Sequence, residues 1–224
     1  MQIANSVILI NSAGTLLGQK LAVHFSQQRA TIVLVDDDAI RLRNTRYLIQ
    51  DSDATVVSFV IPNYEQRSID TLFQQVELTL GRGVDILVNN LQSATLPELT
   101  SEQPAEEFTQ SFTDFSNKLY GFGHASARQM QKNNTHGVIV NVVSNDNASQ
   151  HKLTDTSIIV NSVTKTWADE LDPYHIRVGS VVPGSAYSAR DNNVISLAEV
   201  RHELIRNTEY VVANDYFSGR VVSS

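Results

Sequence analysis

The stretch Val7-Ile-Leu-Ile-Asn-Ser-Ala-Gly-Thr-Leu-Leu-Gly18 joins a wholly apolar run to a polar turn and then to a helical pattern. An apolar run without polar alternation is typical of a strand that is buried on both faces of a sheet. After the turn, leucines and Phe25 recur at helical spacing. The stretch therefore predicts a strand, a turn and a helix, which together form the first unit of an α/β fold.

The same unit recurs along the rest of the chain. Apolar runs alternate with segments of helical periodicity, and Gly81-Arg-Gly83 ends one of the helices. We expect strands at residues 7–10, 31–35, 55–61, 84–88, 138–143, 176–182 and around 221–222, and helices at 16–25, 40–50, 68–80, 108–122, around Lys165 and at 197–206. This order predicts one Rossmann-like domain over residues 1–224, a doubly wound parallel sheet with helices on both faces.

The composition is ordinary for a soluble globular protein and argues against several other classes. The chain has 224 residues, 42% of them hydrophobic and 18% charged, with no cysteine and a formal net charge of −7. The negative charge gives no reason to expect a nucleic-acid partner, and the lack of cysteine excludes disulfides. The scattered histidines form no metal-binding pair. No basic leader or membrane-length apolar run is present, so we expect a cytoplasmic protein without a metal or a membrane partner.

Several motifs, taken in order, resemble the short-chain dehydrogenase/reductase family. They are the polar turn after the first strand, Asp36, Val84-Asp-Ile-Leu-Val-Asn-Asn90, Ser144, Lys165, Ile176-Arg-Val178, Pro183-Gly184 and Phe217-Ser-Gly219. The resemblance covers almost the whole chain. It implies an oxidoreductase that transfers hydride between a nicotinamide cofactor and a small carbonyl or hydroxyl compound.

The resemblance implies a cofactor site at the carboxyl ends of the first strands. The family's G-x-x-x-G-x-G turn corresponds here to Ser12, Leu16 and Gly18, with Gly14 as an extra glycine inside the turn. Leu16 places a branched side chain where the family needs backbone to approach phosphate. The candidate cofactor-binding residues are Ser12, Gly14, Leu17, Gly18, Asp36, Asn89, Lys165, Pro183 and Gly184. The alternative is a strand–turn–helix unit that binds nothing.

Asp36 bears on which cofactor would bind. A carboxylate after the second strand can accept hydrogen bonds from an adenosine ribose, and the run Asp36-Asp-Asp38 would repel a ribose 2′-phosphate. NAD is therefore favoured over NADP, although Arg41 and Arg43 nearby weaken this preference. The alternative is a solvated acidic turn that caps the next helix.

The catalytic pattern lacks one member. The family uses a serine followed by Tyr-x-x-x-Lys, and the resemblance puts Ser144, Asn161 and Lys165 at these three positions. Asn161 cannot replace the tyrosine as proton donor, because a carboxamide does not titrate near neutral pH. Candidate substitutes are His151, which titrates in the useful range, and then Ser157 and Tyr187. The alternative for Lys165 is an exposed helix lysine beside Asp169.

Other positions also depart from the family pattern. Leu91 and Gln92 replace the small residues that let backbone pass close to the cofactor, and Val60 stands where the family has an acid that contacts adenine. Phe115 stands near the asparagine of the family's proton relay and is better explained as part of a core stripe over residues 108–122. The departures gather along the implied cofactor cleft.

Three functional hypotheses follow. The first is an NAD(H)-dependent oxidoreductase with an atypical or impaired active site. The second is a catalytically silent family member that acts as a partner subunit or small-molecule-binding protein. The third is a non-redox dehydratase or isomerase. The resemblance also implies a homodimer or homotetramer, paired through the helices that contain residues 108–122 and Lys165.

Overall fold

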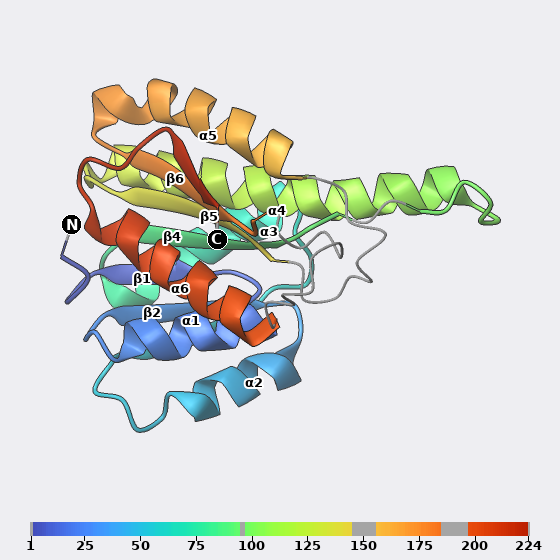
Figure 1. The fold of residues 1–224 in the computed structure, drawn as a ribbon. Coiled ribbons are helices and arrows are strands. Elements are labelled where there is room, and N and C mark those ends of the chain that lie inside the picture. Colours follow the sequence, from blue (N-terminus) through green and yellow to red (C-terminus); the bar gives the residue numbers. More distant parts are fainter. Residues whose placement is uncertain (1, 95–96, 145–155, 185–196, 224) are drawn as a thin grey trace.

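A computed structural model describes residues 2–94, 97–144, 156–184 and 197–223, and all contacts below refer to these residues. Its strands form one parallel sheet in the order β3-β2-β1-β4-β5-β6-β7 (Figure 1). The strands are β1 (Val7–Ile10), β2 (Thr31–Asp36), β3 (Val56–Val60), β4 (Ile86–Gln92), β5 (Val138–Ser144), β6 (Arg177–Val182) and β7 (Arg220–Ser223). The strand order reverses between β1 and β4, which is where doubly wound folds place their ligands. The predicted fold class is confirmed.

Helices cover both faces of this sheet. They are α1 (Leu16–Ser26), α2 (Ala39–Leu48), α3 (Gln66–Leu80), α4 (Pro104–Lys132), α5 (Ser157–Leu171) and α6 (Leu197–Ala213), with the short 3₁₀ helix η1 (Asp172–Tyr174) after α5. One face carries α1, α2 and α6, and the other carries α3, α4 and α5 (Figure 1). No helix in the described part of the chain is long and apolar enough to cross a bilayer.

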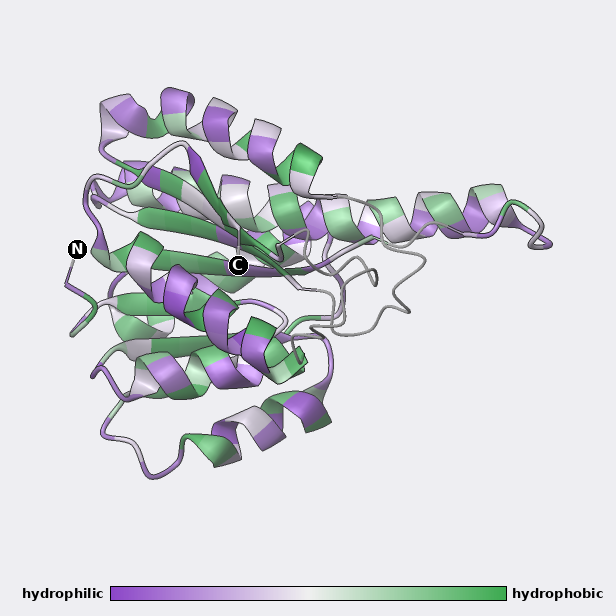
Figure 2. Cartoon of the chain, viewed as in Figure 1, coloured by the Kyte–Doolittle hydropathy of each residue, from purple (hydrophilic) through white to green (hydrophobic). Residues whose placement is uncertain are grey.

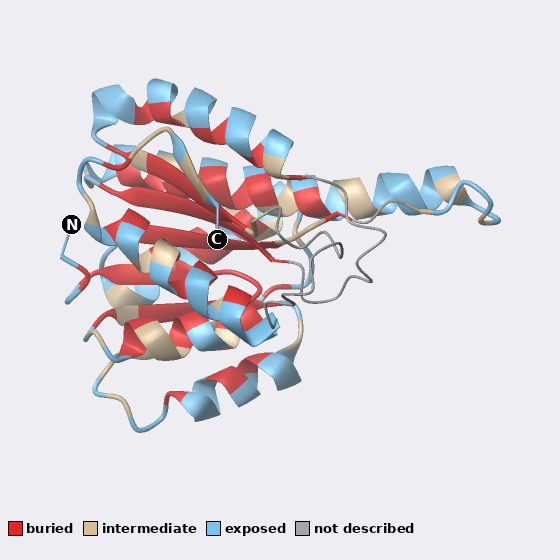
Figure 3. Ribbon diagram, in the orientation of Figure 1, coloured by how far each residue is buried: buried red, intermediate tan, exposed pale blue. Residues whose placement is uncertain are grey.

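The core consists of an apolar layer on each face of the sheet. Ile8 and Ile10 of β1 pack on the α1 side, whereas Val7 and Leu9 pack on the α3 side. Side chains alternate across a strand, so a strand that is covered on both sides must be apolar at every position. Figures 2 and 3 show this pattern as strands that are both hydrophobic and buried. The helices bury one side each and leave the other exposed.

The helix α4 is longer than the phenylalanine stripe predicted. It begins at Pro104 and projects past the sheet before it packs (Figure 1). Phe115, Leu119 and Phe122 are buried, but Phe108 is 42% exposed. The carboxyl-terminal half of the stripe is therefore core, and the amino-terminal half is not.

Candidate functional site

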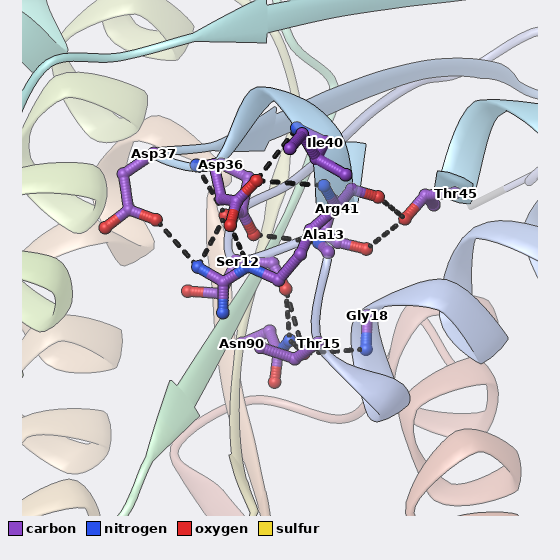
Figure 4. A network of polar contacts seen from close by, with 12 residues as sticks. Ser12, Ala13, Thr15, Gly18, Asp36, Asp37, Ile40, Arg41, Thr45 and Asn90 are labelled. Carbon is purple, nitrogen blue, oxygen red and sulfur yellow. Dashed lines mark hydrogen bonds and ion pairs between the residues drawn. The ribbon is translucent and has the colours of Figure 1, made fainter. Parts of the chain in front are cut away.

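The turn after β1 is held by side chains of a neighbouring strand (Figure 4). Ser12 has a backbone φ of 46°, a left-handed conformation that favours glycine. The Asn90 side-chain amide donates to the Ser12 carbonyl at 3.1 Å and to the Thr15 hydroxyl at 2.9 Å. Thr15 also caps α1 by accepting a hydrogen bond from the Gly18 N–H at 3.1 Å. Side-chain hydrogen bonds therefore hold Ser12 in a backbone conformation that glycine adopts more easily.

Gly18 has no room for a side chain. A Cβ at this position would lie 2.4 Å from the Ser12 carbonyl oxygen and 2.8 Å from Ala13 Cα, both backbone atoms. Neither atom can move without displacing the turn. The surviving third glycine of the motif is thus required by the close packing of α1 against the turn.

Gly14 is explained by the helix α2 and by Asp36. Its N–H donates to the Asp36 carboxylate at 2.8 Å, and a Cβ would lie 2.5 Å from Arg41 Cβ. The Thr45 hydroxyl donates to the Ala13 carbonyl at 2.9 Å and so ties α2 to the same turn (Figure 4). The extra glycine therefore allows α2 to approach the turn closely.

Asp36 is buried at the end of β2 and has several partners. Besides Gly14, its carboxylate accepts from the Asp38 N–H at 3.0 Å and pairs with the Arg41 guanidinium at 3.2 Å. Arg41 also reaches Asp37 at 3.0 Å and Asp38 at 3.3 Å (Figure 4). Burial raises the pKa of Asp36 and the neighbouring Asp37 adds to this rise, while the N–H groups of Asp38 and Gly14 and the charge of Arg41 oppose it. An adenosine ribose would have to share this carboxylate with Arg41, so the preference for NAD stays a prediction.

Tyr64 and Lys118 lie beside these carboxylates. The Lys118 ammonium sits over the Tyr64 ring, 4.1 Å from its centroid, as in a cation–π contact. Burial, followed by the charges of Asp37 and Asp36, raises the pKa of Tyr64, so its hydroxyl stays protonated. Burial lowers the pKa of Lys118, against the pull of the same carboxylates. The sequence alone gave no reason to place either residue here.

Asn89 holds the centre of the sheet edge together. Its carbonyl oxygen accepts from Asn11 at 2.7 Å, and its amide donates to Asn141 at 3.0 Å and to the Leu119 carbonyl at 3.3 Å. It thus connects β4 with the turn after β1, with β5 and with α4. Asn89, one of the candidate cofactor-binding residues, is fully buried and serves here to tie neighbouring elements together.

The turn has features that suit a phosphate group. Ser12 Oγ and Asn90 Oδ1 are buried and find no hydrogen-bond partner of good geometry within the described residues. The first N–H groups of a helix lack intrahelical acceptors and carry partial positive charge, which here concerns Leu16 and Leu17. The Leu17 side chain is fully buried, so only its backbone can face a ligand. The Leu16 side chain lines a groove beside α6. The residues present therefore fit a dinucleotide pyrophosphate.

Ser144 ends β5 among other hydroxyl groups. It is 1% exposed, and its hydroxyl donates to the Leu91 carbonyl at a long 3.5 Å. The Ser144 carbonyl accepts from the Ser93 N–H at 3.0 Å, and the Ser93 hydroxyl lies 3.3 Å from that of Thr156, directly before α5. The start of α5 is therefore level with Ser144, and sequence reasoning missed both Ser93 and Thr156.

Lys165 lies too far along α5 to share this site. The neighbouring Thr164 hydrogen-bonds with Ser180, which pairs in register with Asn141 of β5. Asn141 precedes Ser144 by three residues, or about 10 Å along a strand. Lys165 is also exposed. The structure thus agrees with the alternative of an exposed helix lysine and does not bring Lys165 to Ser144.

Asn161 is likewise exposed, one turn before Lys165. Counted back from Thr164 at about 1.5 Å per residue, the residue of α5 level with Ser144 is Ser157. Ser157 was one of the candidate substitutes for the tyrosine. The other two, His151 and Tyr187, lie outside the described residues.

Pro183 and Gly184 follow β6 and are half-buried at the same sheet edge. Within the described ranges, histidine and acidic side chains form no group that could hold a metal ion. The edge thus gathers Ser12, Asp36 and Asn90 at one end, and Ser93, Ser144 and Thr156 at the other.

Comparison with known proteins agrees with this arrangement. A family model described as short chain dehydrogenase matches residues 6–196. A 3-oxoacyl-[acyl-carrier-protein] reductase of Thermotoga maritima is 27% identical over 82% of this chain and 75% of the relative. A (2S)-[(R)-hydroxy(phenyl)methyl]succinyl-CoA dehydrogenase subunit of Thauera aromatica is also 27% identical, over 82% of this chain and 74% of its own length.

Solved structures are similar in fold. A 3-ketoacyl-(acyl-carrier-protein) reductase of Brucella melitensis, complexed with NADH, superimposes with a TM-score of 0.80. The match covers 99% of this chain and 97% of that chain at 22% sequence identity. At this level of sequence identity the structural similarity supports the fold alone, and membership of the family rests on the match of residues 6–196 to the family model.

Proposed function

This chain belongs to the short chain dehydrogenase family, and we propose that it is an oxidoreductase that transfers hydride between NAD(H) and a small carbonyl or hydroxyl compound, with an atypical or impaired active site. The observation that carries the proposal is the braced turn after β1. Within the described residues, Ser12 Oγ, which lies near the Tyr64 hydroxyl, and Asn90 Oδ1 are buried and make no hydrogen bond of good geometry. They belong to the turn at which doubly wound folds bind a dinucleotide pyrophosphate.

The residues of the turn and of β2 would hold the dinucleotide. The N–H groups at the start of α1 would face the phosphates, and Ser12 and Asn90 would supply further polar atoms. Asp36 would accept hydrogen bonds from the adenosine ribose, in part exchange for its contact with Arg41. Two of the three motif glycines are absent, so affinity is lower than an intact turn would give.

The residues around Ser144 would bind the substrate oxygen. The bound nicotinamide supplies or accepts the hydride. Ser144, with Thr156 and Ser157 near it, offers hydroxyl groups that orient the substrate oxygen, but serine and threonine hydroxyls do not titrate near neutral pH. A missing positioned acid typically slows such a reaction by about 10²- to 10⁴-fold. We therefore expect slow turnover.

The test is NADH oxidation with a panel of small carbonyl compounds that includes a 3-oxoacyl thioester. We expect a slow, substrate-dependent rate that Ser144→Ala lowers further. Ser162→Ala, an exposed serine on α5, is the matched control and should leave the rate unchanged. No rate above that of free NADH with any carbonyl compound would contradict the proposed reaction.

A silent partner subunit is the second candidate. It is favoured by the position of Lys165 and Asn161, which are exposed and away from Ser144. One relative is itself named as a dehydrogenase subunit. This candidate gains support if the protein binds NADH but oxidises none of it.

Pairing of two copies through α4 and α5 is part of the proposal. These helices present exposed apolar side chains, with Tyr120 54% and Ile158 67% exposed. Tyr120 also packs edge-on against Trp167, which joins the two helices into one surface. Light scattering after size-exclusion chromatography should give a dimer or tetramer, and Tyr120→Glu should shift it toward monomer, whereas Tyr216→Glu should not.

A further inference from the structure

A groove runs between α1 and α6, on the face of the sheet away from α4 and α5. Its volume is ≈ 580 Å³. The apolar part of its wall consists of Leu16 and Val23 from α1, Leu48 from α2 and Ile205 from α6. Leu16 is 53% and Leu48 54% exposed. Apolar side chains in a concave site of this size are typical of small-molecule pockets.

Positive charge surrounds this apolar wall. Lys20 and Arg206 line the groove together with His24 and His202, and no carboxylate is among the described residues that line it. Two of these residues pair with acids, His24 with Glu209 at 2.8 Å and Arg206 with Glu203 at 3.9 Å.

The helix α1, which builds one side of the groove, contains a lysine and a histidine and no aspartate or glutamate. The helix α6 on the other side carries two arginines and three glutamates, and its residues that line the groove are Ala198, His202, Ile205 and Arg206. The chain as a whole carries a net charge of −7. Lys20 and Arg206 therefore give the groove lining a local positive charge, which favours an anion over a cation.

We propose that this groove binds a single-chain amphiphile with an anionic head, a carboxylate or a phosphate. The aliphatic chain lies along Leu16, Val23 and Ile205, and the head group meets Lys20 and Arg206. Burial of an exposed leucine against an alkyl chain supplies the affinity, and the two cations supply the selectivity for charge.

The occupant is a small molecule rather than a protein partner because of the size of the groove. The helix α1 has 11 residues, so one of its faces is about 16 Å long. That length suits an alkyl chain of about ten carbons. The proposal does not rest on the redox reaction, because it concerns the outer face of α1 and α6 and not the sheet edge at Ser144.

The first experiment is calorimetric titration with decanoate and with decyl phosphate, below the concentration at which either forms micelles. Both should bind with one site per chain, and the tighter of the two identifies the preferred head group. Butyrate should bind at least about tenfold more weakly, because it buries less apolar area. Decyltrimethylammonium should not bind. Equal binding of the cationic amphiphile, or no saturable binding of either anion, would overturn the proposal.

Two variants locate the site. Lys20→Glu and Leu48→Glu should each weaken decanoate binding by about tenfold or more. Lys132→Glu on α4 and Leu78→Glu on α3 are matched exposed controls on the opposite face and should bind as the parent chain does. Thermal melts establish that all four remain folded. Unchanged affinity in both groove variants, or binding of an acidic amphipathic peptide where decanoate fails, would assign the groove differently.

Discussion

The two ends of the candidate site have lost family residues with different consequences. At the β1–β2 end, side-chain hydrogen bonds from Asn90, Thr15 and Thr45 support the turn where glycines are missing. At the β5–α5 end, Asn161 and Lys165 are exposed, and the side-chain groups that the contacts of the described residues bring near Ser144 are the hydroxyls of Ser93 and Thr156.

The difference teaches that a backbone shape and a proton donor are not equally replaceable. A turn can be held by any set of hydrogen bonds that satisfies its backbone groups. A proton donor must titrate near the working pH, and few side chains do. We therefore expect the nucleotide-binding end to work better than the catalytic end.

The largest expected effect comes from rebuilding the catalytic motif in its structural register. Leu153→Tyr with Ser157→Lys restores Tyr-x-x-x-Lys with the lysine level with Ser144, although Leu153 itself lies outside the described residues. Turnover of NADH with a carbonyl substrate should rise by about 10²- to 10⁴-fold. The measurement is the initial rate of NADH oxidation.

Asn161→Tyr is the matched comparison. It completes the same spacing with Lys165, but about two helical turns farther along α5 than the double variant. Turnover should change little, because the new tyrosine would not face the substrate oxygen. A gain in Asn161→Tyr equal to that of the double variant would contradict the register described for α5.

Substitution of Gly18 should damage the nucleotide-binding end. In Gly18→Ala the new Cβ meets the Ser12 carbonyl oxygen at 2.4 Å, and overpacking of this kind costs about 1–3 kcal/mol. Urea denaturation should show this loss, and NADH affinity should fall with it. Gly121→Ala is the control, because its Cβ would meet only the terminal methyl of Ile69, which can rotate away. Equal losses of unfolding free energy in Gly18→Ala and Gly121→Ala would show that the turn tolerates a Cβ as well as α4 does.

Removal of Arg41 should change cofactor preference. Arg41→Ala frees the Asp36 carboxylate for a ribose and removes a cation that would attract a 2′-phosphate. We expect the ratio of NADH to NADPH affinity to rise by about tenfold. Arg43→Ala, on the same helix, is the control and should leave the ratio unaltered. A fall in NADH affinity alone would mean that Arg41 helps to hold the ribose.

The smallest expected effect concerns the bond between α2 and the turn. Thr45→Val removes the hydrogen bond to the Ala13 carbonyl in a fully buried position and should cost about 1 kcal/mol of unfolding free energy. Thr71→Val removes a similar bond to the Arg67 carbonyl on an exposed helix and should cost less. If both variants lose the same unfolding free energy, the hydrogen bond from Thr45 to the turn contributes no more to stability than an exposed helix bond does.

Most of the fold could be predicted from the sequence. The apolar runs located the strands to within one or two residues, because strands covered on both faces must be apolar, except that β4 continues to Gln92, four residues beyond its predicted end. The turn chemistry was less visible. Asn90 just after an apolar run indicated a polar side chain with a structural hydrogen-bonding role, but nothing in the sequence indicates that its partners are Ser12 and Thr15.

The position of α5 along the strand direction of the sheet could not be predicted. A spacing of four residues fixes two side chains relative to each other on a helix, but not the level of the helix along the sheet. Residues 145–155 separate Ser144 from α5 and carry no periodic pattern that sets this level. An ordinary exposed lysine such as Lys165 therefore satisfies the motif spacing without sharing the site.

Calorimetric titration of the unmodified protein with NADH tests the central claim most directly, and Lys165→Ala is titrated beside it. The account predicts saturable binding at one site per chain, with the same affinity in Lys165→Ala because Lys165 lies about 10 Å along the sheet from Ser144. Absence of binding at millimolar NADH would contradict the claim that the braced turn still accepts a dinucleotide. A large loss of affinity in Lys165→Ala would contradict the position assigned to that residue.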